Sequence, residues 1–275
     1  DRSLGEVFKL FDLIHILTTD HKTVTRITKE VVEDFASENV VYLELRTTPK
    51  KNDSIGMSKH SYMEAVVEGL RAVSAVDIDF IPYKFKTQDS LNSIAMNDAC
   101  DGTKKKRIYV RLLLSIDRRE TTEAAIETVK LALEMRDLGV VGIDLSGNPV
   151  VGEWNTFLPA LKFAQEQSLF ITLHCGEVEI CLTSNIKTES ISSIDIHHFV
   201  DLYNAKHPLV LCTDDAGVFS TSLSNEYKLA STAFGLGKRE MFELARNGIE
   251  FIFAGDEVKQ DLVETFDSAA KKLHL

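Results

Sequence analysis

Two short stretches of the sequence carry the side chains best suited to chemistry. They are His174-Cys175-Gly176-Glu177 and Thr213-Asp214-Asp215, and each directly follows an apolar, β-branched run, residues 169–173 and 209–212 respectively. Imidazole nitrogen and carboxylate oxygen are ligands that suit Zn²⁺, and a carboxylate can also relay protons beside a metal-bound water. The pattern therefore indicates a metal-assisted hydrolytic site at the carboxyl ends of buried strands, where parallel barrels keep their active sites.

The residue types predict a role for each side chain in these stretches. We expect His174 and Asp214 to share a Zn²⁺ ion. Glu177, three residues after His174, is placed to move protons beside a water whose pKa the metal lowers toward neutrality. Asp215 would receive or orient the substrate. A lone histidine in a strand is more often a core residue, but two such motifs together favour the catalytic interpretation.

The elements that position these side chains alternate between apolar strands and amphipathic helices. The sequence predicts strands over 40–46, 107–116, 140–145, 169–173, 179–182 and 209–212, and helices over 4–17, 61–74, 121–137 and 154–167. Near-continuous Val, Ile and Leu runs indicate a parallel sheet covered on both faces. Polar residues follow each strand, and the glycine-rich first loop of an open doubly wound sheet is absent. We therefore predict an α/β fold of the (β/α)8 TIM-barrel type.

Two features indicate that this barrel is incomplete. The helix over 4–17, which begins with a capping box of Ser3 and Glu6, is preceded by no strand. The strand that ends at His174 is followed almost at once by the strand that begins at Glu179. Parallel neighbours need a crossover of a dozen or more residues. We expect about six of the eight strands, with a βα unit of about 30–40 residues missing after Glu177.

The amino-acid composition excludes some classes of protein. Of the 275 residues, 44% are hydrophobic and 27% are charged, and the net charge is −11. This charge argues against a general nucleic-acid or membrane surface, and no apolar run approaches the ~20 residues of a membrane span. Cys100, Cys175, Cys181 and Cys212 form no CxxC pair, which favours reduced, buried thiols. We expect one domain over 1–275 with a disordered insertion at 83–106, in a cytosolic monomer that binds neither nucleic acid nor membranes.

Several motifs together resemble the adenosine/AMP deaminase family. They are LHCGE at 173–177, IDLSGNP at 143–149, SIDRR at 115–119 and CTDD at 212–215. YLELR at 42–46, CLTSN at 181–185 and IDIHHF at 194–199 narrow the resemblance to the adenosine-deaminase-like branch, and to its plant members. The likeness covers nearly the whole chain outside residues 83–106. It implies a zinc-dependent hydrolase of a small purine nucleotide, one that converts N6-methyl-AMP to IMP and methylamine.

The resemblance also implies roles residue by residue. His174 and Asp214 match zinc ligands, Glu177 matches the proton donor, and Gly147 and Asp215 match groups that read the purine. Lysines and backbone N–H groups after the strand at 40–46 suit a phosphate on physical grounds as well. The substrate-binding set that the resemblance implies is His15, Thr48, Pro49, Lys50, Lys51, Asp117, Gly147, His174 and Asp215.

Two motifs of the family are absent from the chain. They are the H-x-H zinc pair of the first strand and the H-G motif of the sixth strand, whose histidine orients the attacking water. His197 and His198 are not expected to replace them, because the family has these residues beside its own zinc ligands. A four-ligand zinc site is worth roughly 10–16 kcal/mol, so two ligands would supply about 5–8 kcal/mol. That corresponds to a Kd on the order of 1 μM to 0.2 mM, and we expect weak zinc binding or none.

Three alternatives to an active deaminase follow from these absences. The chain could be an inactive truncated isoform, as a spliced or mis-predicted product of a deaminase gene would be. It could instead be a nucleotide-binding decoy that keeps the purine and phosphate groups without turnover. A third alternative is another amidohydrolase-type barrel acting on a different C–N bond, against which the Ser146-Gly147-Asn148-Pro149 loop argues.

Overall fold

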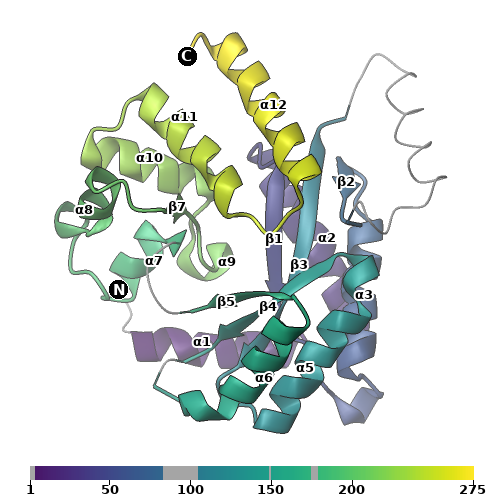
Figure 1. The fold of residues 1–275 in the computed structure, drawn as a ribbon. Coiled ribbons are helices and arrows are strands. Elements are labelled where there is room, and N and C mark those ends of the chain that lie inside the picture. Colours follow the sequence, from purple (N-terminus) through teal and green to yellow (C-terminus); the bar gives the residue numbers. More distant parts are fainter. Residues whose placement is uncertain (1–3, 83–104, 149, 175–178) are drawn as a thin grey trace. The chain divides into compact units, whose positions relative to one another are not determined.

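The computed structural model, drawn in Figure 1, describes residues 4–82, 105–148, 150–174 and 179–275. These residues form two compact units. The larger unit contains Thr18–His174 and Phe253–Gly255, and the smaller unit contains Asp1–Leu17, Cys175–Ile252 and Asp256–Leu275. Ser3 of the predicted capping box and residues 83–104 of the predicted insertion lie outside the described residues.

A parallel sheet forms the centre of the larger unit (Figure 1). Its strands β1 (Tyr42–Thr47), β3 (Arg107–Asp117), β4 (Val140–Ser146) and β5 (Phe170–Leu173) lie side by side in chain order. The short β2 (Asp77–Asp79) pairs with the first residues of β3. Because Thr47 lies opposite Leu114, Asp117 opposite Ser146 and Leu145 opposite Leu173, the carboxyl ends of the four strands meet at one edge. The predicted parallel α/β arrangement is thus confirmed in this unit.

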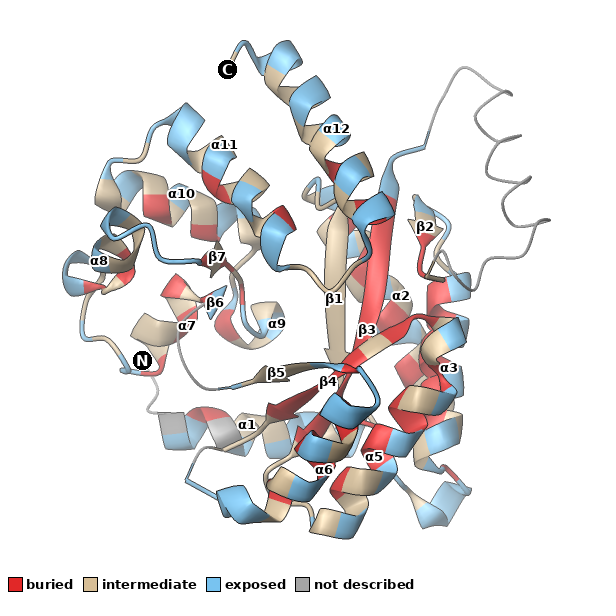
Figure 2. Cartoon of the chain, viewed as in Figure 1, coloured by how far each residue is buried: buried red, intermediate tan, exposed pale blue. Residues whose placement is uncertain are grey.

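The core of the larger unit is concentrated on β3 and β4 (Figure 2). The nine residues of β3 from Ile108 to Ile116 are all buried, as expected for a strand covered on both faces. The helices that link successive strands are α3 (Lys59–Arg71), α5 (Thr122–Glu134) and α6 (Trp154–Glu166). On α5 the buried positions Ala125, Val129 and Ala132 share one face at helical spacing.

Helix α2 (His21–Ser37) packs closely against α3 and was not predicted from the sequence. Its buried face consists of one small or β-branched side chain per turn, a narrow stripe among charged residues. The stripe is Val24, Thr28, Val32 and Ala36. Gly69 on α3 makes the close approach possible, since a Cβ there would lie 2.5 Å from the carbonyl oxygen of Thr25.

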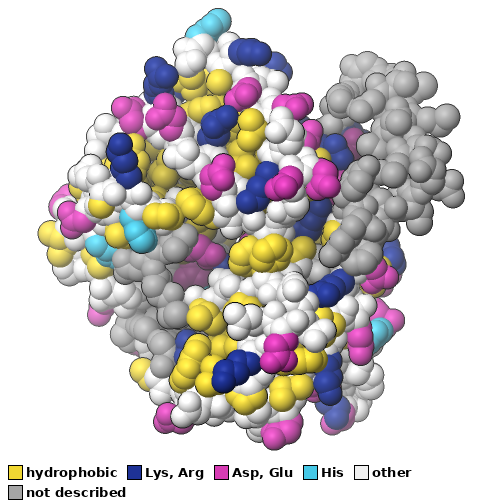
Figure 3. Space-filling model, in the orientation of Figure 1, with side chains coloured by type: hydrophobic (Ala, Val, Ile, Leu, Met, Phe, Trp, Pro, Cys, Tyr) yellow, Lys and Arg dark blue, Asp and Glu magenta, His cyan; other side chains and the backbone are white. Residues whose placement is uncertain are grey.

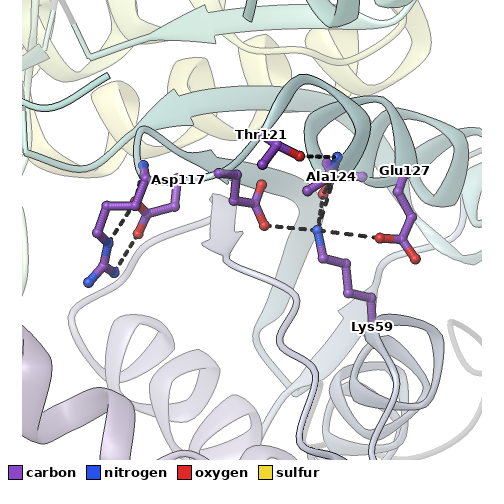
Figure 4. Close-up of polar contacts among 8 residues, drawn as sticks. Lys59, Asp117, Thr121, Ala124 and Glu127 are labelled. Carbon is purple, nitrogen blue, oxygen red and sulfur yellow. Dashed lines mark hydrogen bonds and ion pairs between the residues drawn. The ribbon is translucent and has the colours of Figure 1, made fainter. Parts of the chain in front are cut away.

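A largely buried lysine connects α3 to the start of α5 (Figure 4). Only 12% of the Lys59 side chain is exposed, and its Nζ lies 2.8 Å from Glu120 Oε1 and 2.9 Å from Thr128 Oγ1. The Ala124 carbonyl accepts a third hydrogen bond at 3.2 Å. An ammonium group has three donors, so these three acceptors compensate for its removal from water.

The smaller unit contains a second parallel pair, β6 (Glu179–Ile180) and β7 (Val210–Leu211). Apolar side chains from this pair and its helices form a separate core that includes Leu182, Phe199, Ala230 and Leu244. The helices of the unit are α1 (Leu4–Leu17), α7 (Leu182–Lys187), α8 (Phe199–Asn204), α9 (Ala216–Phe219), α10 (Leu223–Phe234), α11 (Lys238–Asn247) and α12 (Asp256–Leu273).

All six predicted strands occur within the described part of the chain, and β2 is an addition to them. The strand predicted over 179–182 ends earlier, because Leu182 begins α7. Helix α1 has the predicted bounds. None of the helices in the described ranges is both long and apolar enough to cross a membrane. On the face drawn in Figure 3, acidic and basic side chains are interspersed.

Candidate active site

Predicted site residues stand at the carboxyl ends of four strands of the larger unit, at the edge where these ends meet. Lys50 follows β1, Asp117 ends β3, Gly147 follows β4 and His174 follows β5. The backbone keeps these segments adjacent, since the Arg118 N–H donates to the Ser146 carbonyl and the His174 N–H to the Leu145 carbonyl, both at 3.0 Å. This unit therefore gathers seven of the eleven predicted site residues at a single edge.

A buried carboxylate holds the His174 ring. Asp144, on β4, is fully buried, and its Oδ1 lies 3.0 Å from His174 Nδ1. An ionised carboxylate only accepts hydrogen bonds, so Nδ1 carries the proton and the ring's lone pair lies on Nε2. Ser115 Oγ donates to the second Asp144 oxygen at 3.3 Å, and Arg46 Nε lies 4.0 Å from it. Such a carboxylate–histidine pair is the usual way of fixing the tautomer of a metal-binding imidazole.

Asp117 and Gly147 lie in direct proximity. Arg119 donates hydrogen bonds to both oxygens of the Asp117 carboxylate, from Nε at 2.9 Å and from Nη2 at 2.6 Å (Figure 4). The Arg119 backbone N–H donates a third hydrogen bond to Asp117 Oδ1 at 2.8 Å. Gly147 has a φ of +99°, and a Cβ there would lie 3.2 Å from Asp117 Oδ1. A side chain at position 147 would crowd this carboxylate, so glycine is required by both the backbone and the space.

The loop after β1 presents a cation in a positively charged setting. Burial, and to a smaller extent the charge of Arg119, lowers the pKa of Lys50 to about 8. Its Nζ donates to Thr18 Oγ1. Pro49 is buried, whereas Lys51 is exposed and lies 3.3 Å from Asp53. Two neighbouring cations repel each other, so an anion bound beside Lys50 would relieve that repulsion.

The smaller unit holds the other predicted residues. Asp214 is exposed at the end of β7, in a left-handed conformation with a φ of 54°, and Ser184 Oγ on α7 donates to its Oδ2 at 2.7 Å. Strained backbone of this kind often occurs at functional sites. Asp215 is exposed and precedes α9, whose Phe219 N–H donates to its carbonyl at 3.0 Å. His15 is half-buried on α1.

Glu177, with its neighbours 175–178, lies outside the described residues. In the described ranges, no three His, Cys, Asp or Glu side chains are grouped closely enough to hold a metal ion. His197 does not compensate, because its Nδ1 accepts a hydrogen bond from the Phe199 N–H at 3.0 Å and its Nε2 donates to Asn185 Oδ1 at 3.2 Å. Neither nitrogen of that ring has a lone pair left for a metal.

Three residues that contact the predicted site residues were not predicted from the sequence. Asp144 holds His174, Arg119 holds Asp117 and Ser184 holds Asp214. Asp144 gave a signal, as the one charged residue in the apolar strand Val140–Ser146. Arg119 also gave one, because it stands two residues from Asp117 at a strand end. Ser184 had no local signal, since thirty positions separate it from its partner.

Comparison with known proteins places these observations in a family. The family model described as adenosine deaminase matches residues 1–179 and 177–269. The chain is 65% identical over 308 residues to an N6-mAMP deaminase from Arabidopsis thaliana, covering 98% of this chain and 85% of that protein. A crystal structure of Arabidopsis ADAL complexed with IMP has a TM-score of 0.88 at 63% identity, covering 98% of this chain and 84% of the other.

A more distant structure shares the fold. An amidohydrolase from Burkhoderia ambifaria with bound Zn has a TM-score of 0.72 at 18% identity, covering 95% of this chain and 79% of the other. The predicted fold class is confirmed by these structural matches. The family model spans nearly all of the sequence, and the Arabidopsis relative matches through most of its own length. The chain therefore belongs to the adenosine deaminase family.

Proposed function

We propose that this chain acts on N6-methyl-AMP, hydrolysing it to IMP and methylamine. The observation that carries the proposal is the 65% identity to the Arabidopsis N6-mAMP deaminase over 98% of the chain. Solved relatives at 63% identity hold IMP or GMP, which are both purine 5′-monophosphates. A small purine nucleotide is therefore the ligand class that we propose, for a cytosolic monomer with a single barrel domain.

The edge of the larger unit supplies groups for such a ligand. We assign the 5′-phosphate to the loop Thr48-Pro49-Lys50-Lys51 and to Asp117. His15, which lies in the smaller unit, stays a proposed substrate-binding residue. Lys50 is the principal phosphate group in this assignment, because its partly buried ammonium already lies in the field of Arg119. We propose Gly147 in this unit, and Asp215 in the smaller unit, as groups that read the purine. The absence of a side chain at position 147 keeps the Asp117 carboxylate accessible to the ligand.

The donors present suit zinc in kind. His174 offers an imidazole whose Nε2 lone pair is fixed by Asp144, and Asp214 offers a carboxylate oriented by Ser184. We propose each of them as a zinc ligand, His174 in the larger unit and Asp214 in the smaller unit. Zinc, when bound, supplies a water of lowered pKa to such a site. Asp144 keeps the His174 ring in its metal-binding tautomer, and Glu177 transfers a proton to the leaving amine.

A second candidate is nucleotide binding without turnover. The eight histidines include no H-x-H or H-G motif. The family model matches in two segments that meet at residues 177–179, and the 308-residue alignment with the Arabidopsis relative is longer than the chain itself. These observations support the interpretation that the relative has a segment, at the position beside Glu177, that this chain lacks. A two-ligand metal site would bind zinc weakly, as estimated above.

One experiment separates the two candidates. The purified chain is incubated with N6-methyl-AMP, with and without added Zn²⁺, while IMP is measured by chromatography and nucleotide affinity by calorimetry. An Asp214→Asn variant serves as the matched control, because it keeps the size and the Ser184 contact but loses the anionic ligand.

Zinc-dependent IMP formation that the variant lacks supports the deaminase. Nucleotide binding without IMP, equal in both proteins, supports the second candidate. If neither binding nor turnover is found while a version carrying the missing segments of the Arabidopsis relative is active, both candidates are wrong for this chain.

A further inference from the structure

Two free cysteines of the smaller unit lie opposite each other on neighbouring strands. β6 and β7 pair in parallel with Glu179 opposite Val210 and Ile180 opposite Leu211, so the next pair along is Cys181 and Cys212. The Cys212 N–H donates to the Ile180 carbonyl at 2.9 Å, which extends the ladder to this position. The register therefore fixes the two cysteines side by side.

The positions of the side chains agree with this register. The Cys181 thiol interacts with the Cys212 thiol, and this contact, together with burial, raises the pKa of Cys181. Neighbouring strands lie about 4.7–4.9 Å apart, and disulfides form between residues whose Cα atoms are about 4.4–6.8 Å apart. Both residues have intermediate exposure. No change in strand pairing is needed to bring the two sulfur atoms together.

We propose that Cys181 and Cys212 are a modification site, at which a low-molecular-weight disulfide oxidises the two thiols to an intramolecular disulfide. In the first step one thiolate attacks the reagent's S–S bond, forming a mixed disulfide and expelling one reagent thiol. In the second step the neighbouring thiolate attacks the protein sulfur of that mixed disulfide and expels the other reagent thiol. The two cysteines together lose two electrons and two protons. The reagent disulfide takes up these electrons and protons and leaves as two thiols.

The disulfide would join two segments that already meet at Asp214. Cys181 directly precedes α7, which carries Ser184, and Ser184 Oγ donates to Asp214 Oδ2 at 2.7 Å. Cys212 lies two residues before Asp214 on the other segment. A covalent link at the base of both segments would close a loop over residues 182–211 and restrict its unfolded conformations. Oxidation is therefore expected to raise the thermal unfolding midpoint of the smaller unit.

The test uses the full chain with Cys100→Ser and Cys175→Ser, which leaves only the proposed pair. The protein is incubated with oxidised glutathione, free thiols are counted with Ellman's reagent, and intact and digested protein are weighed by mass spectrometry. We expect loss of both thiols, no retained glutathione, a monomer on a non-reducing gel, and a peptide that links residues 181 and 212. Dithiothreitol should restore both thiols.

A matched control carries Cys181→Ser in the same background, so that glutathione attached to Cys212 cannot be displaced and remains. The unsubstituted chain, digested after the same treatment, must yield the same linked peptide, which guards against misfolding of the variant. Two thiols that stay free while the urea-unfolded chain is oxidised would overturn the proposal. A stable glutathione adduct on the intact pair would do so as well.

Discussion

The buried His197 ring should make the stability of the smaller unit depend on pH. His197 is 2% exposed, and both ring nitrogens are used, Nδ1 as acceptor from Phe199 and Nε2 as donor to Asn185. A second proton would have to displace the Phe199 N–H from Nδ1. Burial, and next the positive charge of His198, whose ring centroid lies 4.4 Å away, lowers the pKa of His197 to about 4.

The sign and size of the effect follow from linkage. The unfolded chain binds a proton at this histidine near its ordinary pKa of 6.5, whereas the folded chain does so only near 4. Well above pH 6.5 the group therefore has almost no effect, and stability is lost progressively as the pH falls through 6.5 toward 4. The loss is about 2 kcal/mol between pH 7 and pH 5, and it approaches about 3 kcal/mol below pH 4.

The measurement is urea unfolding at pH 7 and pH 5, followed by NMR signals of the smaller unit, in the native chain and in His197→Gln. Other groups titrate in both proteins, so the difference between their pH dependences isolates His197. A histidine ring titration in the native chain gives the pKa directly. His198→Gln is the control, and it should leave the pKa of His197 well below 6.5, because burial is the larger cause. A His197 pKa near 6.5, or equal losses of stability in both proteins, would refute the reasoning.

Three further predictions concern the larger unit. Lys59→Met leaves the Glu120 carboxylate without its cation and should lower the free energy of unfolding by about 3 kcal/mol. Lys51→Met, which removes the exposed pair with Asp53, should lower it by only about 0–1 kcal/mol. Both free energies are measured by urea unfolding. Gly69→Ala places a Cβ against α2 and should cost about 1–3 kcal/mol, and an unchanged urea midpoint would contradict the described helix contact. Because the pKa of Lys50 is about 8, affinity for purine monophosphates should fall between pH 8 and 9.5 in calorimetry, and Lys50→Met should remove that dependence if the phosphate assignment is right.

The strands of the sheet could be predicted because the apolar pattern of each strand lies within its own few residues. β3 and β4 are buried on both faces, so their sequences are near-continuous apolar runs that stand out from their surroundings. Helix α2 gave no such signal, since its buried stripe is narrow and consists of small residues. The three-residue β2 is too short to show a period, and it owes its existence to pairing with β3.

The site residues could be predicted because they stand at the ends of apolar runs, whereas the contacts that hold their side chains could not be predicted. His174 and Asp214 each directly follow an apolar run, and the carboxyl end of a parallel strand is where such folds keep their chemistry. The positions of Asp144 and Ser184, thirty residues from their partners, depend on register between strands and on the packing of α7. Sequence spacing alone contains no information about such contacts, because many registers satisfy the same apolar pattern.

The pairing of β3 has a consequence for synthesis of the chain. β1 and β2 each pair with β3, and β3 ends seventy residues after β1. At 5–20 residues per second, a ribosome takes roughly 4–14 s to make that stretch. During this interval β1 lacks β3, its partner among the described strands, so it presents an open edge to other chains. Chaperone dependence and aggregation of the nascent protein should therefore be greatest before residue 117 emerges, and should fall once β3 is available.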